Sequence, residues 1–464
     1  MPTAMAPRRI NRATLYFFGA LGGILFGYDM GVISGVLLYI KKIWSLGSVA
    51  QGTVGGCLAV GAMVGAAFAG RLSDRFGRRK LIMLAAAVFA IGTIGCALAP
   101  EVTTLIVFRF VVGIAVGGCS ATVPMYLAEL APTRTRGMMA SLNQIMIVTG
   151  ILIAYIVDWA LSFSGNWRAM LGAALLPALA LLIGMFFLPE TPRWLLARGH
   201  DDAAREVLRG AQRDVDVDAE IAGIRQVIQL DRSQRGRLRD LVTPLVRPAL
   251  VVALILAVGQ QFCGVNAVNF YAPTMFTDLG FGQSASLLAS IVLGTVKVAF
   301  TAWVVFVVDR WGRKPLLLIG NVFMAATLLL LGVAVLTLHS TTASGISTLI
   351  LLMLYLAGYE LGWGAIVWLM MSEVFPLKAR GVGMGVSSVV LWAGTFSITF
   401  VFPIMNNGLG LAASAWIFAA VSVVLYILVA KFVPETKGRS LEEIELDLRA
   451  RVGGATARQA SPAS

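Results

Sequence analysis

Twelve apolar segments, each long enough to cross a lipid bilayer, set the limits on how this 464-residue chain can fold. About 20 consecutive apolar residues span the hydrocarbon core as a helix. Mean hydropathy is +0.83, and charged residues make up 13% of the chain against about 25% in soluble proteins. We therefore expect an all-α integral membrane protein and exclude a soluble enzyme, a disulfide-stapled secreted domain and a disordered chain. The predicted spans are 14–39, 49–70, 81–99, 103–127, 138–160, 169–188, 249–276, 284–308, 315–338, 346–371, 381–404 and 411–432.

The basic residues lie on one side of these predicted spans. Of the 37 lysines and arginines, 32 fall in loops after even-numbered spans or near the two ends of the chain. This asymmetry is typical of polytopic membrane proteins whose basic loops face the cytoplasm. We predict a multi-pass protein of the cell (inner) membrane with both termini cytoplasmic. The same distribution accounts for the net charge of +13, because the basic residues lie in membrane-flanking loops. It therefore excludes nucleic acid as a binding partner.

Side chains that could hold a cofactor or carry out catalysis are scattered along the chain. The four cysteines lie in apolar segments without metal-ligand spacing, and the two histidines are far apart. The sequence has no G-x-x-x-x-G-K-S/T phosphate loop and no clustered nucleophile and base. We therefore predict that the protein is neither an enzyme nor a transport ATPase. We also predict no catalytic residue, no bound metal and no cofactor.

Three motifs recur in the same order in the two halves of the chain. The pairs begin at Asp74 and Asp309, Glu129 and Glu373, and Pro189 and Pro434, and they are separated by 235, 244 and 245 residues. A near-constant offset indicates an internal repeat. Two parallel six-span repeats are a transporter architecture, with the substrate bound between them near the membrane midplane.

The repeat divides the chain into four parts. We expect a six-helix half at 14–188, a cytosolic linker at 189–247, a second six-helix half at 248–433 and a cytosolic tail at 434–464. Apolar residues at helical spacing predict short amphipathic helices in the linker, and a Ser-x-x-Glu capping box predicts one in the tail.

The motifs together resemble those of the sugar porter family of the major facilitator superfamily. The resemblance covers essentially the whole chain and rests on the repeated D-R-x-G-R-R/K loops, Pro189–Arg193, Gln260–Asn266 and Pro434–Gly438. It implies two six-helix halves that import a monosaccharide by alternating access. It also implies that the chain works as a monomer in the lipid bilayer.

Asp29 and Arg109 are charged residues inside apolar spans. A charge in a span is rare and faces a partner or water. The residues alone leave open a proton acceptor tuned by Arg109 or a static ion pair that fixes packing. The resemblance favours the first interpretation, because proton-coupled members of the family carry these two residues and facilitators lack the aspartate. An uncoupled sugar facilitator remains the alternative.

Side-chain amides and tryptophans inside the spans could bind a sugar. Amides donate and accept hydrogen bonds, and aromatic rings stack on the apolar faces of a pyranose. The plain alternative is that amides hold helices together and that tryptophans anchor at the interface. The resemblance implies that the sugar-contacting positions are Gln144, Gln260, Gln261, Asn266, Glu360, Trp368 and Trp392.

Lys297 departs from the family, which usually has asparagine at this position. It lies twelve residues before Asp309, or about 18 Å along a helix. Three interpretations are open: Lys297 neutralises Glu360, hydrogen-bonds the substrate, or attracts an anionic sugar acid. Plant polyol transporters are similar at this position. Together with Leu391, where a polar residue is common, Lys297 keeps a myo-inositol or polyol symporter as an alternative function.

The prolines common before the tryptophan of the tenth span are absent. Gly362 and Gly364 remain to bend that helix.

Charged residues at the predicted cytoplasmic ends of spans could form an inner gate. The plain interpretation is that they fix topology and cap helices, whereas the resemblance implies salt bridges that open and close during alternating access. These residues are Arg75, Arg78, Glu129, Arg136, Glu190, Arg313, Glu373 and Arg380.

Overall fold

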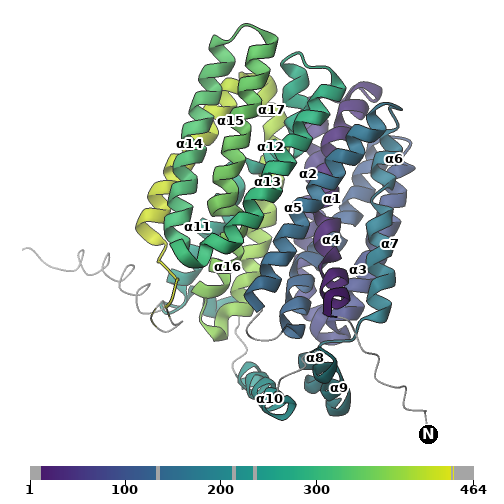
Figure 1. Cartoon of the computed structure of the whole chain (residues 1–464), viewed down its shortest axis with the longest axis vertical. Helices are drawn as coiled ribbons and strands as arrows, with labels where there is room; N and C mark the ends of the chain where they lie inside the picture. The colour runs from purple at the N-terminus through teal and green to yellow at the C-terminus, as the bar shows by residue number, and fades with distance from the viewer. Residues whose placement is uncertain (1–11, 132–135, 212–215, 234–237, 440–442, 444–464) are drawn as a thin grey trace, which may run out of the picture. The chain divides into compact units, whose positions relative to one another are not determined.

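The computed structural model describes residues 12–131, 136–211, 216–233, 238–439 and 443. Within these ranges the chain is helical and contains no strand (Figure 1). The helices of the N-terminal part are α1 (Arg12–Ile43), α2 (Ser48–Phe76), α3 (Arg78–Ala97), α4 (Val102–Leu130), α5 (Arg136–Ser162), α6 (Trp167–Gly172) and α7 (Leu175–Phe187). The helices that follow are α8 (Pro192–Ala197), α9 (Asp201–Ala211), α10 (Val217–Ser233), η2 (Leu238–Val242), α11 (Arg247–Phe262), α12 (Val265–Asp278), α13 (Gln283–Trp311), α14 (Arg313–Thr337), α15 (Thr341–Tyr359), η3 (Glu360–Gly364), α16 (Ala365–Val374) and α17 (Leu377–Phe432).

The described residues contain eleven helical segments long and apolar enough to cross a membrane. The last of them, Ala379–Phe432, holds two spans, because Gly410 has non-helical dihedral angles of φ 81° and ψ 167°. The break falls between the two spans predicted at 381–404 and 411–432. The all-α membrane architecture is therefore confirmed.

Two of the long spans are interrupted near their middle. Gly264 adopts the left-handed conformation (φ 98°, ψ 5°) between α11 and α12. A Cβ there would lie 2.8 Å from the ring of Phe418, so glycine meets both the backbone and the packing requirement. In the tenth predicted span the π-helix η3 separates α15 from α16 and includes Gly362 and Gly364. π-turns of this kind bend helices and are frequent at functional sites.

The repeat seen in the sequence is also a repeat of local geometry. Gly77 joins α2 to α3 with φ 98° and ψ 157°, and Gly312 joins α13 to α14 with φ 91° and ψ 161°. Backbone of this kind is open essentially to glycine alone. The same sharp turn therefore stands at both copies of the D-R-x-G-R-R/K motif.

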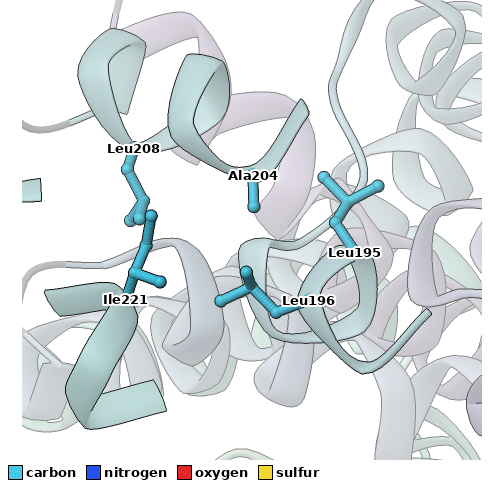
Figure 2. Packing of buried hydrophobic residues seen from close by; sticks show 5 residues of the cluster. All are labelled: Leu195, Leu196, Ala204, Leu208 and Ile221. Atoms are coloured by element: carbon cyan, nitrogen blue, oxygen red, sulfur yellow. The ribbon is translucent and has the colours of Figure 1, made fainter. Parts of the chain in front are cut away.

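Three short helices follow the sixth span and form a small core of their own. Leu195 and Leu196 of α8, Ala204 and Leu208 of α9 and Ile221 of α10 are buried together (Figure 2). The short helices predicted in 189–247 are therefore present. The helix predicted in the tail falls mainly on residues outside the described ranges.

Contacts divide the chain into two compact units, which we describe separately. The first comprises residues 1–32, 57–157 and 166–235, and the second comprises residues 33–56, 158–165 and 236–464. The ends of α1, α2 and α5 thus pack with the C-terminal helices. The division into halves at 189–247 stays a prediction.

Candidate functional site

The first unit contains a buried ion pair between α1 and α4. Arg109 Nη2 lies 3.5 Å from Asp29 Oδ2. Arg109 is 0% exposed and Asp29 is 5% exposed. The two charges that the sequence places in separate apolar spans are therefore in contact, and each compensates the other.

Glycines bring the helices around this ion pair close together. A Cβ at Gly27 of α1 would overlap the carbonyl of Ile147 in α5, and a Cβ at Gly113 of α4 would overlap the carbonyl of Leu58 in α2. Small residues of this kind allow close packing of membrane helices. Cys57, next to Leu58, also interacts with Arg109.

The second unit contains a network of buried amides where α11 gives way to α12. Gln261 Oε1 accepts hydrogen bonds from Asn266 Nδ2 at 2.6 Å and from Thr395 Oγ1 of α17 at 3.0 Å. Gln261 Nε2 donates to Gln260 Oε1 at 3.2 Å, and Gln260 Nε2 donates to the carbonyl of Trp363 at 2.8 Å. The break at Gly264 turns the chain so that side chains from both sides of it meet.

Lys297 extends the amide network to a second ion pair. Its Nζ donates to Asn269 Oδ1 at 2.9 Å and lies 3.5 Å from Glu360 Oε1. Asn269 Nδ2 is 3.5 Å from Asn266 Oδ1, which links the two groups. Thr301 Oγ1 donates to Glu360 Oε2 at 3.0 Å. The contact with Glu360 supports the first interpretation of Lys297, that it neutralises this carboxylate.

Glu360 opens the π-helix η3, so the irregular helix places this carboxylate. A Cβ at Gly364 would overlap Glu360 Oε2. The Glu360 carboxyl therefore lies over the π-helix turn at Gly364, where glycine has no side chain. Trp363 is fully buried, and its Nε1 donates to Asn321 Oδ1 at 3.2 Å.

The remaining predicted sugar-binding residues occupy other helices. Trp392 in α17 is buried, and Trp368 in α16 is half-buried. Gln144 in α5 is half-buried and belongs to the first unit. The structure thus joins Gln260, Gln261, Asn266, Lys297 and Glu360 in one network. The sugar-binding role of these five and of the other three stays a prediction.

The predicted gate residues form matching pairs within each unit. Arg78 Nε lies 3.2 Å from Glu129 Oε2, and Arg313 Nη2 lies 3.5 Å from Glu373 Oε1. Each pair joins the start of one span to the end of another, α3 to α4 and α14 to α16. Arg380 is half-buried.

Arg75 does not take part in these two pairs. The guanidinium of Arg75 lies 5.3 Å from the ring centroid of Phe76. The side chain of Arg136 falls outside the part of the structure that is described.

Glu190 and Glu435 accept hydrogen bonds from the backbone at the two sharp glycine turns, in equivalent positions of the repeat. Glu190 Oε1 accepts from the backbone N–H of Arg78 at 3.0 Å, and Glu435 Oε1 accepts from that of Arg313 at 3.1 Å. Burial raises the pKa of the Glu190 carboxyl, while hydrogen bonds from the backbone of Thr191, Arg79 and Arg78 act in the opposite direction. Each carboxylate therefore caps the helix that begins at its turn.

Sequence reasoning missed several members of the network. Asn269, Thr301 and Thr395 are not among the predicted sugar-contacting positions. Asn269 follows Asn266 by three residues on one helix, which places both on the same face. That spacing was the available signal for Asn269. The threonines carry no signal, because a hydroxyl in a span often bonds to its own backbone.

A separate cavity of about 590 Å³ lies in the second unit, at the ends of α1, α2 and α12 and beside the Gly410 break of α17. Its polar lining includes Lys41, Gln51, Tyr271, Asp278 and Asn406. None of the predicted sugar-binding residues is among the described residues that line it. This cavity is therefore distinct from the amide network.

Comparison with known proteins places the chain in a family. A family model described as "Sugar (and other) transporter" matches residues 15–448. The glucose transporter GlcP of Staphylococcus epidermidis is 42% identical over 448 residues, covering 97% of this chain and 100% of that protein. The D-xylose transporter of Levilactobacillus brevis is 43% identical over 449 residues, covering 96% and 98%.

Solved structures similar to this chain are also sugar transporters. The inward-open structure of the xylose transporter XylE from E. coli matches with a TM-score of 0.81 and 31% identity, over 94% of this chain and 99% of that one. A further structure is that of the proton:xylose symporter XylE bound to 6-bromo-6-deoxy-D-glucose. The chain described here therefore belongs to the sugar porter family of the major facilitator superfamily.

Proposed function

We propose that this sugar transporter imports a monosaccharide, a pentose or hexose, together with a proton. It works as a monomer in the cell membrane with both termini in the cytoplasm. The amide network at the break between α11 and α12 carries the substrate part of this proposal. The Asp29–Arg109 pair carries the proton part.

The amide network suits a neutral polyhydroxylated ligand. Gln260, Gln261 and Asn266 offer both donors and acceptors within a buried site, as sugar hydroxyls require. Some of their present hydrogen bonds are to one another, and sugar hydroxyls would replace these bonds rather than leave buried amides unpaired. The glucose and D-xylose transporters among the relatives support a monosaccharide as the substrate.

The Asp29–Arg109 pair suits reversible proton binding. Arg109 stabilises the carboxylate, and burial without water favours the neutral acid. Two such opposed effects allow a carboxyl to gain and lose a proton as its surroundings change. The description of XylE as a proton:xylose symporter supports this assignment, which comes to this chain as a proposal.

The gate pairs are the contacts that we expect to form and break as the transporter alternates between its two states. Arg78–Glu129 and Arg313–Glu373 sit at equivalent places in the two repeats and tie together the ends of neighbouring spans. We assign them to the cytoplasmic side, where such contacts hold one state closed and separate in the other.

Lys297 and Glu360 bear on the class of substrate. Their charges compensate each other at 3.5 Å, so the pair presents no net positive charge to a ligand. This favours a neutral sugar over a sugar acid. A neutral polyol such as myo-inositol satisfies the same condition and is the second candidate.

The deciding experiment is a substrate-triggered current in proteoliposomes. The wild type and Asp29→Asn are compared with xylose, glucose, galactose, myo-inositol, a linear polyol and a hexuronate. Asp202→Asn, an exposed acid on α9, is the matched control. A current with a neutral monosaccharide that disappears only in Asp29→Asn supports the proposal. Exchange without current would make the protein a facilitator, and a response to the hexuronate alone would overturn the substrate class.

A further inference from the structure

Asp158 is a buried carboxyl that the proposed mechanism does not use. It lies near the end of α5, four residues before Ser162, and is 0% exposed. It belongs to the second unit, together with residues 33–56 of α1 and α2. Both sides of its contact with α1 therefore lie in one compact unit.

The Asp158 carboxyl lies directly against the backbone of α1. A Cβ at Gly35 would overlap Asp158 Oδ2, so this carboxyl occupies the space that any other residue at position 35 would fill. Gly35 is thus required for the carboxyl to be accommodated between the two helices.

The contact brings Asp158 no compensating charge. Within the described part of the chain, neither Oδ1 nor Oδ2 has a hydrogen-bond partner of full geometry, and no cation forms a salt bridge with Asp158. The backbone N–H of Gly35 is the group that favours its carboxylate form. Tyr39 of α1 is the ionisable group in electrostatic contact with it, and the Tyr39 hydroxyl donates to the carbonyl of Ser162 instead. Lys41 and Lys42 stand beyond Tyr39, at the end of α1.

Physical chemistry then fixes the charge state of Asp158. A carboxylate without a partner is strongly disfavoured in a membrane interior, whereas the protonated acid is neutral. Asp29 differs, since Arg109 compensates it. The conformation described here therefore requires a proton on Asp158.

The unit that contains Asp158 also contains contacts that alternating access must undo, because they join the two predicted six-helix halves. In the same unit, a Cβ at Gly52 of α2 would overlap the carbonyl of Phe400 in α17, and Tyr271 donates to the carbonyl of Thr399 at 2.8 Å. When such contacts separate, water reaches the ends of α1 and α5. Gly35 is six residues, or about 9 Å of helix, from Lys41.

We propose that Asp158 is a second proton-binding residue of this transporter. Its carboxyl is protonated while the contacts with α17 keep water from the ends of α1 and α5, and it releases that proton to water when these contacts separate, leaving a carboxylate. The proposal rests on the proposed alternating access, but it does not require Asp29 to be the coupling residue.

Infrared spectroscopy of the purified full-length protein in lipid tests the protonation directly. The C=O stretching band of protonated carboxyls is compared between the wild type and Asp158→Asn, with Tyr39→Phe and Asp29→Asn as controls. We expect the loss of one protonated-carboxyl band in Asp158→Asn and its retention in both controls. An unchanged band pattern in Asp158→Asn overturns the proposal. This measurement needs no transported sugar, so it stands even if the proposed substrate is wrong.

The release step is tested by the pH dependence of D-xylose exchange in proteoliposomes. We expect Asp158→Asn to bind and exchange D-xylose but to lose one step of the pH profile that Tyr39→Phe keeps. A profile identical to the wild type shows that the proton never leaves, and it overturns the proposal. Should Asp158→Asn fail to fold, Gly35→Ala is used, because its added methyl must displace the carboxyl. A shifted protonated-carboxyl band then supports the proposal, and an unshifted band overturns it.

Discussion

Lys297 Nζ lies 3.5 Å from Glu360 Oε1, and the two residues are 4% and 1% exposed. Removing one partner of a buried pair leaves an uncompensated charge, which costs about 3–5 kcal/mol of the free energy of unfolding. We expect Lys297→Met to lose about this amount. The double variant Lys297→Met/Glu360→Gln should regain most of the loss, because it removes both charges. Thermal unfolding of the purified protein in detergent measures both changes.

Lys42→Met is the matched control for this pair. Lys42 is exposed at the end of α1, and we expect its replacement to change stability by less than about 0.5 kcal/mol. A double variant no more stable than Lys297→Met would contradict the interpretation that Lys297 neutralises Glu360.

The hydrogen bond from Thr395 to Gln261 predicts an effect on sugar binding. The Thr395 hydroxyl lies 3.0 Å from Gln261 Oε1 and 3.1 Å from the carbonyl of Leu391 in its own helix, so its proton is shared between the two acceptors. Thr395→Val removes this donor and keeps the shape of the side chain. A hydrogen bond of this kind contributes about 0.5–1.5 kcal/mol, so sugar affinity should fall by up to about tenfold. Titration calorimetry with the sugar identified by the current measurements tests it.

Thr277→Val controls for the loss of a hydroxyl. Thr277 bonds to the carbonyls of Pro273 and Thr274 within its own helix. Its replacement should leave sugar affinity unchanged. If both variants bind equally well, Thr395 does not position Gln261.

The spans could be predicted because hydropathy alone determines them. The break at Gly410 also falls where two predicted spans meet. The contact between Asp29 and Arg109 follows from the rule that charges in a membrane pair with each other. The amides from Gln260 to Asn266 were identified by their motif, and their assembly required the left-handed turn at Gly264.

The sequence could not provide the contacts between distant helices. The periodicity of a span indicates which residues share a face, but not which residue of another span stands opposite. Thr301 bonds to Glu360 across 59 positions of sequence, and no local signal marks it. Asp158 was overlooked for a different reason. It lies two residues before the predicted span end at 160, where an acid is expected to face water.

The glycine turns of the repeat predict equivalent losses of stability in the two halves. Gly77 and Gly312 have φ of 98° and 91°, and a Cβ on either would meet the carboxylate of Glu190 or Glu435. Gly77→Ala and Gly312→Ala should each lower the free energy of unfolding by about 1–3 kcal/mol. Thermal unfolding tests this, with Gly70→Ala of α2 as the control.

Gly70 is helical, and a Cβ there meets no atom within 4 Å. Its replacement should raise stability by about 0.5–1 kcal/mol. If Gly77→Ala behaved like Gly70→Ala, the turn would not require glycine.

The raised pKa of Glu190 predicts a pH dependence of stability. Burial makes the folded state bind a proton at Glu190 more readily than the unfolded state, whose carboxyl has the ordinary glutamate pKa of 4.5. This contribution is therefore fully present below that value and is lost as pH rises through the higher folded pKa. Glu190→Gln removes it, so the wild type should gain stability relative to the variant as pH falls toward about 4.5. Unfolding curves across this range measure the difference, with exposed Glu206→Gln as the control. A difference that grows in the opposite direction would exclude burial as the dominant influence on Glu190.

The close contact between α2 and α17 predicts how the transporter can be held open. Gly52 packs on the carbonyl of Phe400, where even a Cβ would overlap, so Gly52→Trp must separate the two helices. We expect this variant to bind sugar but to lose transport, because the conformation described here becomes inaccessible. Asn406 lines the neighbouring cavity, so Asn406→Cys should react faster with a membrane-impermeant maleimide when Gly52→Trp is present. Gly282→Trp, at a position outside that cavity with no atom within 4 Å of a Cβ, is the control and should leave both transport and labelling unchanged. Equal labelling with and without Gly52→Trp would show that the α2–α17 contact does not close this face.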